Sequence, residues 1–203
     1  MNFYNSLLNS LQTKPFILGE GLKSHFSVLV PFIGKEKDTL LFELRAKGIR
    51  QPGEICFPGG MVEKGETPEQ CAVREAAEEL GITREKIHIT AQAGCIVSHT
   101  DAIVHVFVGT LDIESTAETK PNAQEVAELY SIPSSYFIEN KPDIYKVKSF
   151  TQTGDFPAKE LGLPQKYHNN WSGGSRNIYV YKYGGITIWG LTAAILYNLI
   201  SLV

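Results

Sequence analysis

Apolar residues recur along this chain in short runs, several of them alternating with polar positions, which is the pattern of β-strands in a half-buried sheet. The clearest run, 102–111, reads AIVHVFVGTL. A polar, turn-forming segment at 34–38 separates two such runs and predicts a hairpin. The predicted strands cover 25–33, 39–45, 86–96, 102–111, 125–132, 143–150 and 177–183.

One predicted helix carries its own start and stop signals. Thr67 can cap the helix, Pro68 suits the first helical position, and Gln70 completes a capping box. Gly81 then ends the helix. These signals predict a helix over 68–80. Periodic apolar residues predict three others, an amphipathic helix over 1–14, a short one over 133–138 and a strongly apolar one over 188–202.

Three glutamates share one face of the capped helix. At about 100° per residue, Glu78 lies about 60° to one side of Glu75 and Glu79 about 40° to the other. Like charges at this spacing repel, and a cation between them would turn the repulsion into attraction. Because hard divalent ions prefer oxygen ligands, the face is suited to Mg²⁺ or Mn²⁺. Arg74 could orient a neighbouring carboxylate.

Strands on both sides of a central helix, with another helix near the end, predict an α/β fold in which helices sandwich a mixed sheet. A length of 203 residues fits one domain over 1–203. Residues 151–176 lack clear periodicity. A loop of this length in a compact domain is usually functional or disordered, so this one is a candidate lid or wall of a substrate pocket.

Composition narrows the class of protein. Nineteen basic residues against 22 acidic ones give a net charge of −3, and no basic tract favours nucleic-acid binding. Three scattered cysteines indicate neither a disulfide framework nor a zinc site. No apolar run is long enough to span a membrane, and 1–14 lacks the pattern of a signal peptide. The C-terminal SLV is not the peroxisomal SKL signal, so the expected location is the cytoplasm.

Residues 60–82 read GMVEKGETPEQCAVREAAEELGI and resemble the Nudix box, GX5EX7REUXEEXGU, where U is a bulky aliphatic residue. The fixed letters fall on the residues Gly60, Glu66, Arg74, Glu75, Glu78, Glu79 and Gly81. Ala76 stands where a larger aliphatic residue is usual. The resemblance implies a Nudix α/β/α sandwich and a pyrophosphatase that works with Mg²⁺ or Mn²⁺.

Residues 40–60, LLFELRAKGIRQPGEICFPGG, resemble the extra motif of Nudix enzymes that cleave coenzyme A, roughly LLTXR(S/A)X3RX3GX3FPGG. Arg45, Arg50 and Phe57 carry much of the match. Glu43 stands where the family often has Thr, and two residues rather than three separate Arg50 from Gly53. Further along, 122–126 with 132–133 resembles the NxxEV…VP element of the same subfamily, and 188–193 its IWGLTA helix.

The resemblance implies a set of site residues. Glu75, Glu78 and Glu79, with the carbonyl of Gly60, would bind the metal. The candidates for the proton-accepting base are Glu75, Glu78 and Glu125, while Glu66 and Arg74 would support the site from behind the ligands. Substrate binding is expected from Arg45, Arg50, Lys47 and Phe57, since guanidinium groups match phosphate geometry.

The resemblance implies that the protein hydrolyses coenzyme A or acyl-coenzyme A to 3′,5′-ADP and (acyl-)4′-phosphopantetheine. Two alternatives remain open. One is a Nudix pyrophosphatase for ADP-ribose, a dinucleotide or a nucleoside triphosphate. The other is a non-catalytic nucleotide-binding module, which retention of all the box glutamates disfavours. The expected partner is a small molecule, without nucleic acid or membrane, and apolar faces of the terminal helices could support a homodimer.

Overall fold

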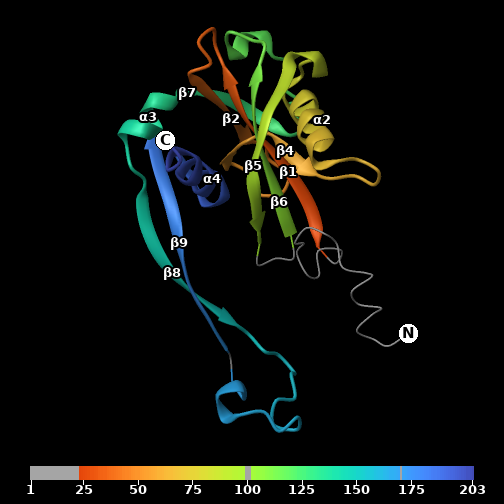
Figure 1. Cartoon of the computed structure of the whole chain (residues 1–203), viewed down its shortest axis with the longest axis vertical. Helices are drawn as coiled ribbons and strands as arrows, with labels where there is room; N and C mark the ends of the chain where they lie inside the picture. The colour runs from red at the N-terminus through yellow and green to blue at the C-terminus, as the bar shows by residue number, and fades with distance from the viewer. Residues whose placement is uncertain (1–22, 99–101, 170) are drawn as a thin grey trace, which may run out of the picture.

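The computed structural model describes residues 23–98, 102–169 and 171–203 (Figure 1). The helix predicted over 1–14 lies outside the described residues. Within them, the helices are α2 (Pro68–Leu80), α3 (Ser134–Glu139) and α4 (Gly190–Ile200). Short 3₁₀ turns are η2 (Arg84–Lys86), η3 (Thr116–Glu118) and η4 (Gln165–Tyr167).

The described residues form a main sheet of seven strands. Its strands are β1 (Ser24–Ile33), β2 (Thr39–Arg45), β3 (Ile55–Cys56), β4 (Gly59–Met61), β5 (Ile87–Val97), β6 (Ala102–Leu111) and β7 (Val126–Pro133). The central path runs β3–β2–β1–β6–β5, with β4 paired to β1 and β7 paired to β2. The pairing of β1 with β6 is parallel and the other pairings are antiparallel, so the sheet is mixed, as predicted.

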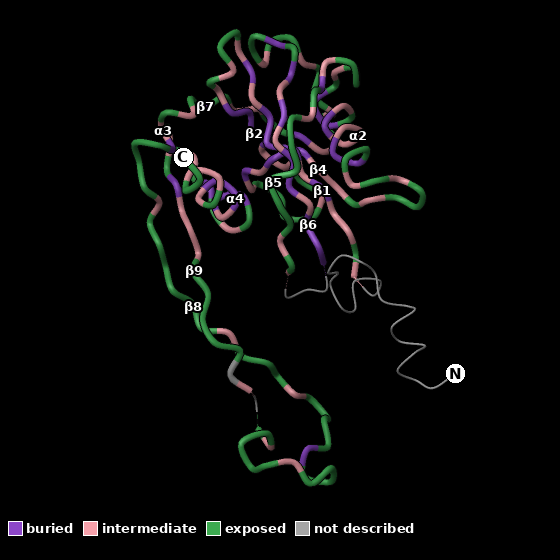
Figure 2. The backbone as a smooth tube through the Cα atoms, in the orientation of Figure 1, coloured by how far each residue is buried: buried purple, intermediate pink, exposed green. Residues whose placement is uncertain are grey.

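Each face of the main sheet has its own apolar core. On one face, α2 packs Ala72, Ala76 and Leu80 against side chains that include Leu29 and Leu41. On the other face, residues of α4 pack against a second cluster of strand residues. Figure 2 shows the buried residues concentrated along the sheet and the facing sides of the helices. This arrangement confirms the predicted α/β/α sandwich.

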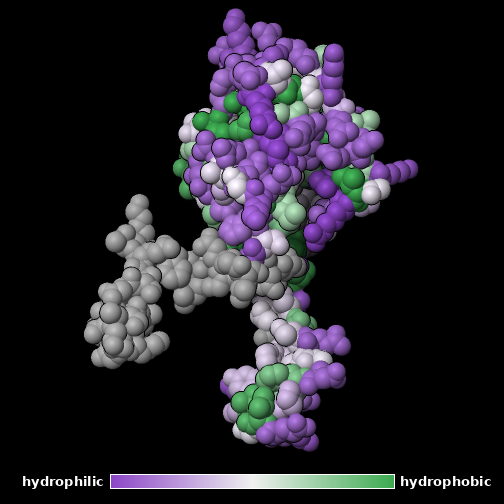
Figure 3. All heavy atoms as spheres, turned by 90° about the vertical axis from the view of Figure 1, so that its right-hand side faces the viewer, coloured by the Kyte–Doolittle hydropathy of each residue, from purple (hydrophilic) through white to green (hydrophobic). Residues whose placement is uncertain are grey.

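A second, three-stranded sheet consists of β8 (Asp143–Thr151), β9 (Trp171–Tyr183) and β10 (Ile186–Trp189) in the order β10–β9–β8. Strands β8 and β9 form a long hairpin that extends away from the main sheet (Figure 1). Hydrophobic side chains gather at its far end (Figure 3), where Phe156 packs edge-on against Trp171.

Several predicted boundaries differ from the structure by one or two residues, and the starts of β9 and α4 differ for a reason that pairing explains. Strand β9 begins at Trp171 rather than at 177, because its first residues pair with β8 through the backbone while most of their side chains are exposed and carry no hydrophobic alternation. Helix α4 begins at Gly190 rather than at 188, because Ile188 and Trp189 pair with β9 as part of β10. Gly190 has a φ of 62°, in the left-handed region that favours glycine, and the chain turns there from the strand into the helix.

The proposed lid segment therefore splits into two parts. Thr151 belongs to β8 and residues 171–176 belong to β9, while residues 152–169 lie towards the far end of the hairpin (Figure 1). Its role as a lid stays a prediction. None of the helices described in the structure combines the length and the apolar character needed to cross a bilayer.

Candidate active site

Helix α2 is held at both ends as the sequence predicts. The Thr67 hydroxyl accepts a hydrogen bond from the backbone N–H of Gln70 at 3.2 Å. The Gln70 side chain accepts one from the backbone N–H of Thr67 at 2.9 Å. Gly81 closes the helix in the left-handed region with a φ of 62°. These caps fix the rotation of α2 and thereby the direction in which its glutamates point.

The turn into β4 lies directly against two of these glutamates. The backbone N–H of Gly59 donates a hydrogen bond to Oε2 of Glu79 at 2.8 Å. A Cβ added to Gly60 would lie 2.2 Å from Oε1 of Glu75, so the carboxylate occupies the space that a side chain would need. Glycine at 60 thus lets the main chain and the Glu75 carboxylate approach closely.

Arg74 organises three of the carboxylates. Its Nε and Nη2 donate to the two oxygens of Glu66 at 2.9 and 3.0 Å, a bidentate pair. Its Nη1 donates to Glu75 at 2.9 Å and lies 3.3 Å from Glu78. The hydrogen bonds to Glu66 are the main cause that raises the pKa of Arg74, and they lower the pKa of Glu66. Arg74 and Glu66 thus lie beside Glu75 and Glu78, and their supporting roles stay predictions.

Burial disfavours ionisation of two carboxylates on α2. It is the main cause that raises the pKa of Glu75, with smaller increases from the charges of Glu78 and Glu125, while Arg74 lowers it. Burial also raises the pKa of Glu79, and the neighbouring charge of Glu43 raises it further. Glu79 is 4% exposed. Such a set of mutually repelling, partly buried carboxylates is characteristic of a site that binds a cation.

Glu43 belongs to this group, although sequence reasoning did not select it. It is 0% exposed, and burial raises its pKa. Oε1 of Glu43 accepts a hydrogen bond from the thiol of Cys56 at 3.2 Å. One feature of the sequence could have identified Glu43. It is a carboxylate in the middle of the apolar strand TLLFELR, at the position where the motif of coenzyme A-cleaving Nudix enzymes often has Thr.

A cleft of about 290 Å³ opens beside the Gly59–Gly60 turn. Arg45, Arg50 and Phe57 line it, together with the first turn of α4. Arg45 is oriented by its Nε, which donates to the carbonyl of Arg50 at 2.8 Å. The ring of Phe57 also belongs to the core and stacks on Phe42, with centroids 4.9 Å apart. The structure thus brings together the two arginines and the glycine turn of the box.

The remaining predicted site residues are Glu125, Glu78 and Lys47. Glu125 lies beside the end of β2, where its carbonyl accepts a hydrogen bond from Ala46 at 2.8 Å, and its charge acts on Glu43 and Glu75. The side chain of Glu78 is 54% exposed. Lys47 is exposed on the turn after β2 and does not line the cleft, so its role in binding stays a prediction.

The oxygen-rich set of Glu75, Glu78, Glu79 and the Gly60 carbonyl has the chemistry that Mg²⁺ or Mn²⁺ prefers. Within 23–98, 102–169 and 171–203, no three acidic, histidine or cysteine side chains already converge on one point. Arg74 instead holds Glu75 and Glu78 by hydrogen bonds. The donor set therefore fits a divalent cation by its chemistry and requires the carboxylates to reorient towards it.

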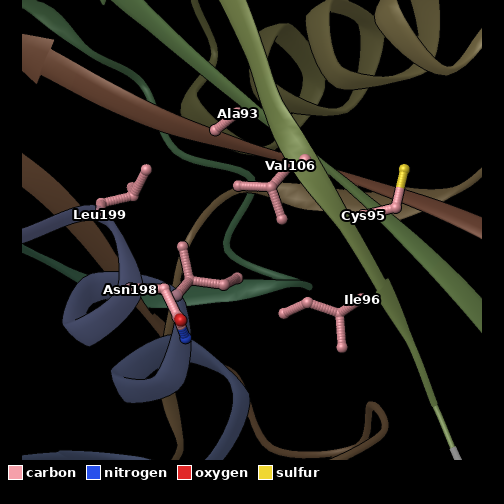
Figure 4. A pocket seen from close by; sticks show the side chains of 8 residues that line it. Ala93, Cys95, Ile96, Val106, Asn198 and Leu199 are labelled. Carbon is pink, nitrogen blue, oxygen red and sulfur yellow. The ribbon is translucent and has the colours of Figure 1, made fainter. Parts of the chain in front are cut away.

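A second cavity, of about 260 Å³, lies between β5, β6 and α4. Figure 4 shows Ile96 and Val106 on the strand side and Asn198 and Leu199 on the helix side. Strand β5 has a register shift between Gln92 and Gly94 at this place. Bulges of this kind are frequent next to binding sites, and small residues on the bulge leave the cavity open.

The two cavities follow one side of β6 and of α4. Val104 lines the first and Val106 the second, and residues two apart on a strand share a face. Along α4, Thr192 lines the first cavity and Ile195 the second, three residues apart on one helix face. The cleft and the second cavity therefore lie along the same faces of β6 and α4.

The family model for the NUDIX domain matches residues 23–145 of this chain. The match covers the main sheet, the glycine turn and α2, and the chain therefore belongs to the Nudix family. Members of this family are hydrolases that act on phosphoric anhydrides.

Individual relatives differ in coverage. The chain is 39% identical over 132 residues to the peroxisomal coenzyme A diphosphatase NUDT7 of Mus musculus, over 64% of this chain and 54% of the relative. It thus spans about half the length of that protein. It is 29% identical over 202 residues to the uncharacterized Nudix hydrolase NudL of Photorhabdus laumondii, over 98% of this chain and 94% of the relative.

A solved structure of similar type is the Nudix hydrolase RenU from M. smegmatis. Its TM-score is 0.47 at 22% identity, covering 56% of this chain and 73% of RenU.

Proposed function

We propose that this protein hydrolyses the diphosphate of coenzyme A or acyl-coenzyme A to 3′,5′-ADP and (acyl-)4′-phosphopantetheine. The observation that carries the proposal is that Arg45 and Arg50 line the same cleft as the glycine turn of the Nudix box. Coenzyme A has a separate 3′-phosphate besides its diphosphate, and a cationic wall next to a diphosphate site suits both groups. The similarity to NUDT7, a coenzyme A diphosphatase, supports the same substrate class.

In this proposal, Glu75, Glu78 and Glu79 and the Gly60 carbonyl hold Mg²⁺ or Mn²⁺. The bound ion supplies charge neutralisation of the diphosphate and a lower pKa of coordinated water. Arg74 and Glu66 keep the glutamates oriented, since Arg74 bridges Glu66 and Glu75. One carboxylate among Glu75, Glu78 and Glu125 takes the proton as water attacks a phosphorus atom in line. Positioning and electrostatics are sufficient, and no covalent intermediate is required.

Arg50→Ala tests the substrate directly. Because a charge-assisted hydrogen bond contributes about 1.5–3 kcal/mol, its loss should raise the KM for coenzyme A by about tenfold or more. The KM for dephospho-coenzyme A, which lacks the 3′-phosphate, should change far less. Steady-state kinetics on both substrates, with Arg84→Ala as a control outside the cleft, provide the measurement. An equal rise for both substrates would show that Arg50 does not bind the 3′-phosphate.

We propose that the acyl chain occupies the second cavity, between β5, β6 and α4. Ala93→Phe should fill it, and since each buried methylene contributes about 0.8 kcal/mol, exclusion of two methylenes should lower kcat/KM for octanoyl-coenzyme A by about tenfold. Activity on free coenzyme A should stay close to that of the wild type. Val97→Phe, on the same strand but outside the lining of this cavity, is the matched control. Equal losses on both substrates would place the acyl chain elsewhere.

A small-molecule partner agrees with the family, while the homodimer and the cytoplasmic location stay predictions.

A further inference from the structure

Glu43 has an environment that is unusual for a carboxylate. It lies on β2 two residues after Leu41, so both point to the face of the sheet that α2 covers. Its side chain is 1% exposed. Oε1 is bonded to the Cys56 thiol, but Oε2 is buried without a hydrogen-bond partner in the described part of the chain. Since leaving a buried polar atom unpaired is costly, this oxygen requires an explanation.

The charges around Glu43 are mainly negative. The charges of Glu75 and Glu125 act on Glu43, and the charge of Glu43 acts on Glu79. Arg45 is a nearby cation, but its Nη1 is 3.9 Å from Oε1 of Glu43, and its Nε is committed to the carbonyl of Arg50. Arg74, the arginine of the box, is paired with Glu66, Glu75 and Glu78. Carboxylates therefore outnumber the cations that could neutralise them.

We propose that Glu43 is a further carboxylate donor to a divalent cation bound around Glu79. The unpaired Oε2 is then a ligand position, and carboxylate oxygens are the donors that Mg²⁺ and Mn²⁺ prefer. The inference rests on the proposed cation site of the Nudix box and is independent of which diphosphate is the substrate. It assigns a role to a residue outside the box, at a position where the resembling motif often has Thr.

The direct test is a Mn²⁺ titration of the full chain without substrate, with free Mn²⁺ measured by electron paramagnetic resonance. Glu43→Gln and Glu43→Thr should weaken Mn²⁺ binding by about tenfold or more, or lower the number of ions bound per chain. Glu128→Gln, an exposed carboxylate on the neighbouring strand β7, is the matched control and should bind like the wild type. Unchanged affinity and stoichiometry in both Glu43 variants would overturn the proposal. No binding by the wild type would overturn the cation site itself.

Thermal unfolding separates this role from a purely structural one. Without metal, Glu43→Gln removes a buried charge and should melt at the same temperature as the wild type or higher. With saturating Mn²⁺, the wild type should gain more in melting temperature than the variant. An equal loss of melting temperature with and without Mn²⁺ would indicate that Glu43 only packs the sheet, and would contradict the proposal.

Discussion

Glu75→Gln should lower kcat by about a hundredfold to a thousandfold, the usual cost of removing one electrostatic group from a catalytic site. Glu75 lies against Gly60 and accepts a hydrogen bond from Arg74. The substitution keeps the shape of the side chain but removes its charge. Because burial, and then the charges of Glu78 and Glu125, already raise the pKa of Glu75 and disfavour its ionisation, the melting temperature should change little.

The control for this variant is Glu69→Gln, an exposed carboxylate in the first turn of the same helix. It should keep nearly wild-type kcat, since Glu69 contacts the helix start and not the cleft. Initial rates at saturating substrate and Mg²⁺, together with circular dichroism of both variants, give the comparison. Glu75→Gln activity above about a tenth of the wild type would reject the assigned role, because that loss is only about 1.4 kcal/mol.

Gly60→Ala should also reduce kcat strongly, by about a hundredfold, through displacement of the Glu75 carboxylate. The new Cβ would lie 2.2 Å from Oε1 of Glu75, and a flexible side chain yields more readily than the backbone. The fold should therefore survive while the carboxylate moves away from its position. Enzyme kinetics and a thermal melt of the same preparation test both parts of this expectation.

Gly59→Ala is the informative comparison. Its Cβ would lie 2.3 Å from the backbone carbonyl oxygen of Ser27 on β1, which cannot move without disturbing the sheet. Overpacking of this kind costs about 1–3 kcal/mol, and the melting temperature should fall by several degrees. If Gly60→Ala instead loses stability like Gly59→Ala and keeps its kcat, the contact between Gly60 and Glu75 has no catalytic importance.

The parts of the site that are local in sequence could be predicted well. The caps of α2, its limits at 68 and 80, and the common face of its glutamates depend on residues within a few positions of one another. The hairpin of β1 and β2 also follows from a short polar turn between two apolar strands. Propensity and periodicity are sufficient in such segments because no distant contact competes with them.

The parts that depend on distant contacts could not be predicted. Glu43 becomes part of the carboxylate group only because β2 packs beneath α2, which lies far along the chain. The first residues of β9 form a strand because β8 offers backbone partners, although their side chains show no alternation. The second cavity, beside α4, likewise forms where β5, β6 and α4 meet, at a bulge that a hydrophobic pattern does not reveal.

The most direct test of the central claim is product analysis by mass spectrometry in H₂¹⁸O. The purified protein is incubated with Mg²⁺ and an equimolar mixture of coenzyme A, ADP-ribose, NADH, diadenosine polyphosphates and nucleoside triphosphates. The proposed function predicts that 3′,5′-ADP and 4′-phosphopantetheine form first, with ¹⁸O in one of the two. Faster cleavage of another diphosphate would contradict the substrate assignment, and no cleavage with either Mg²⁺ or Mn²⁺ would contradict the hydrolase itself.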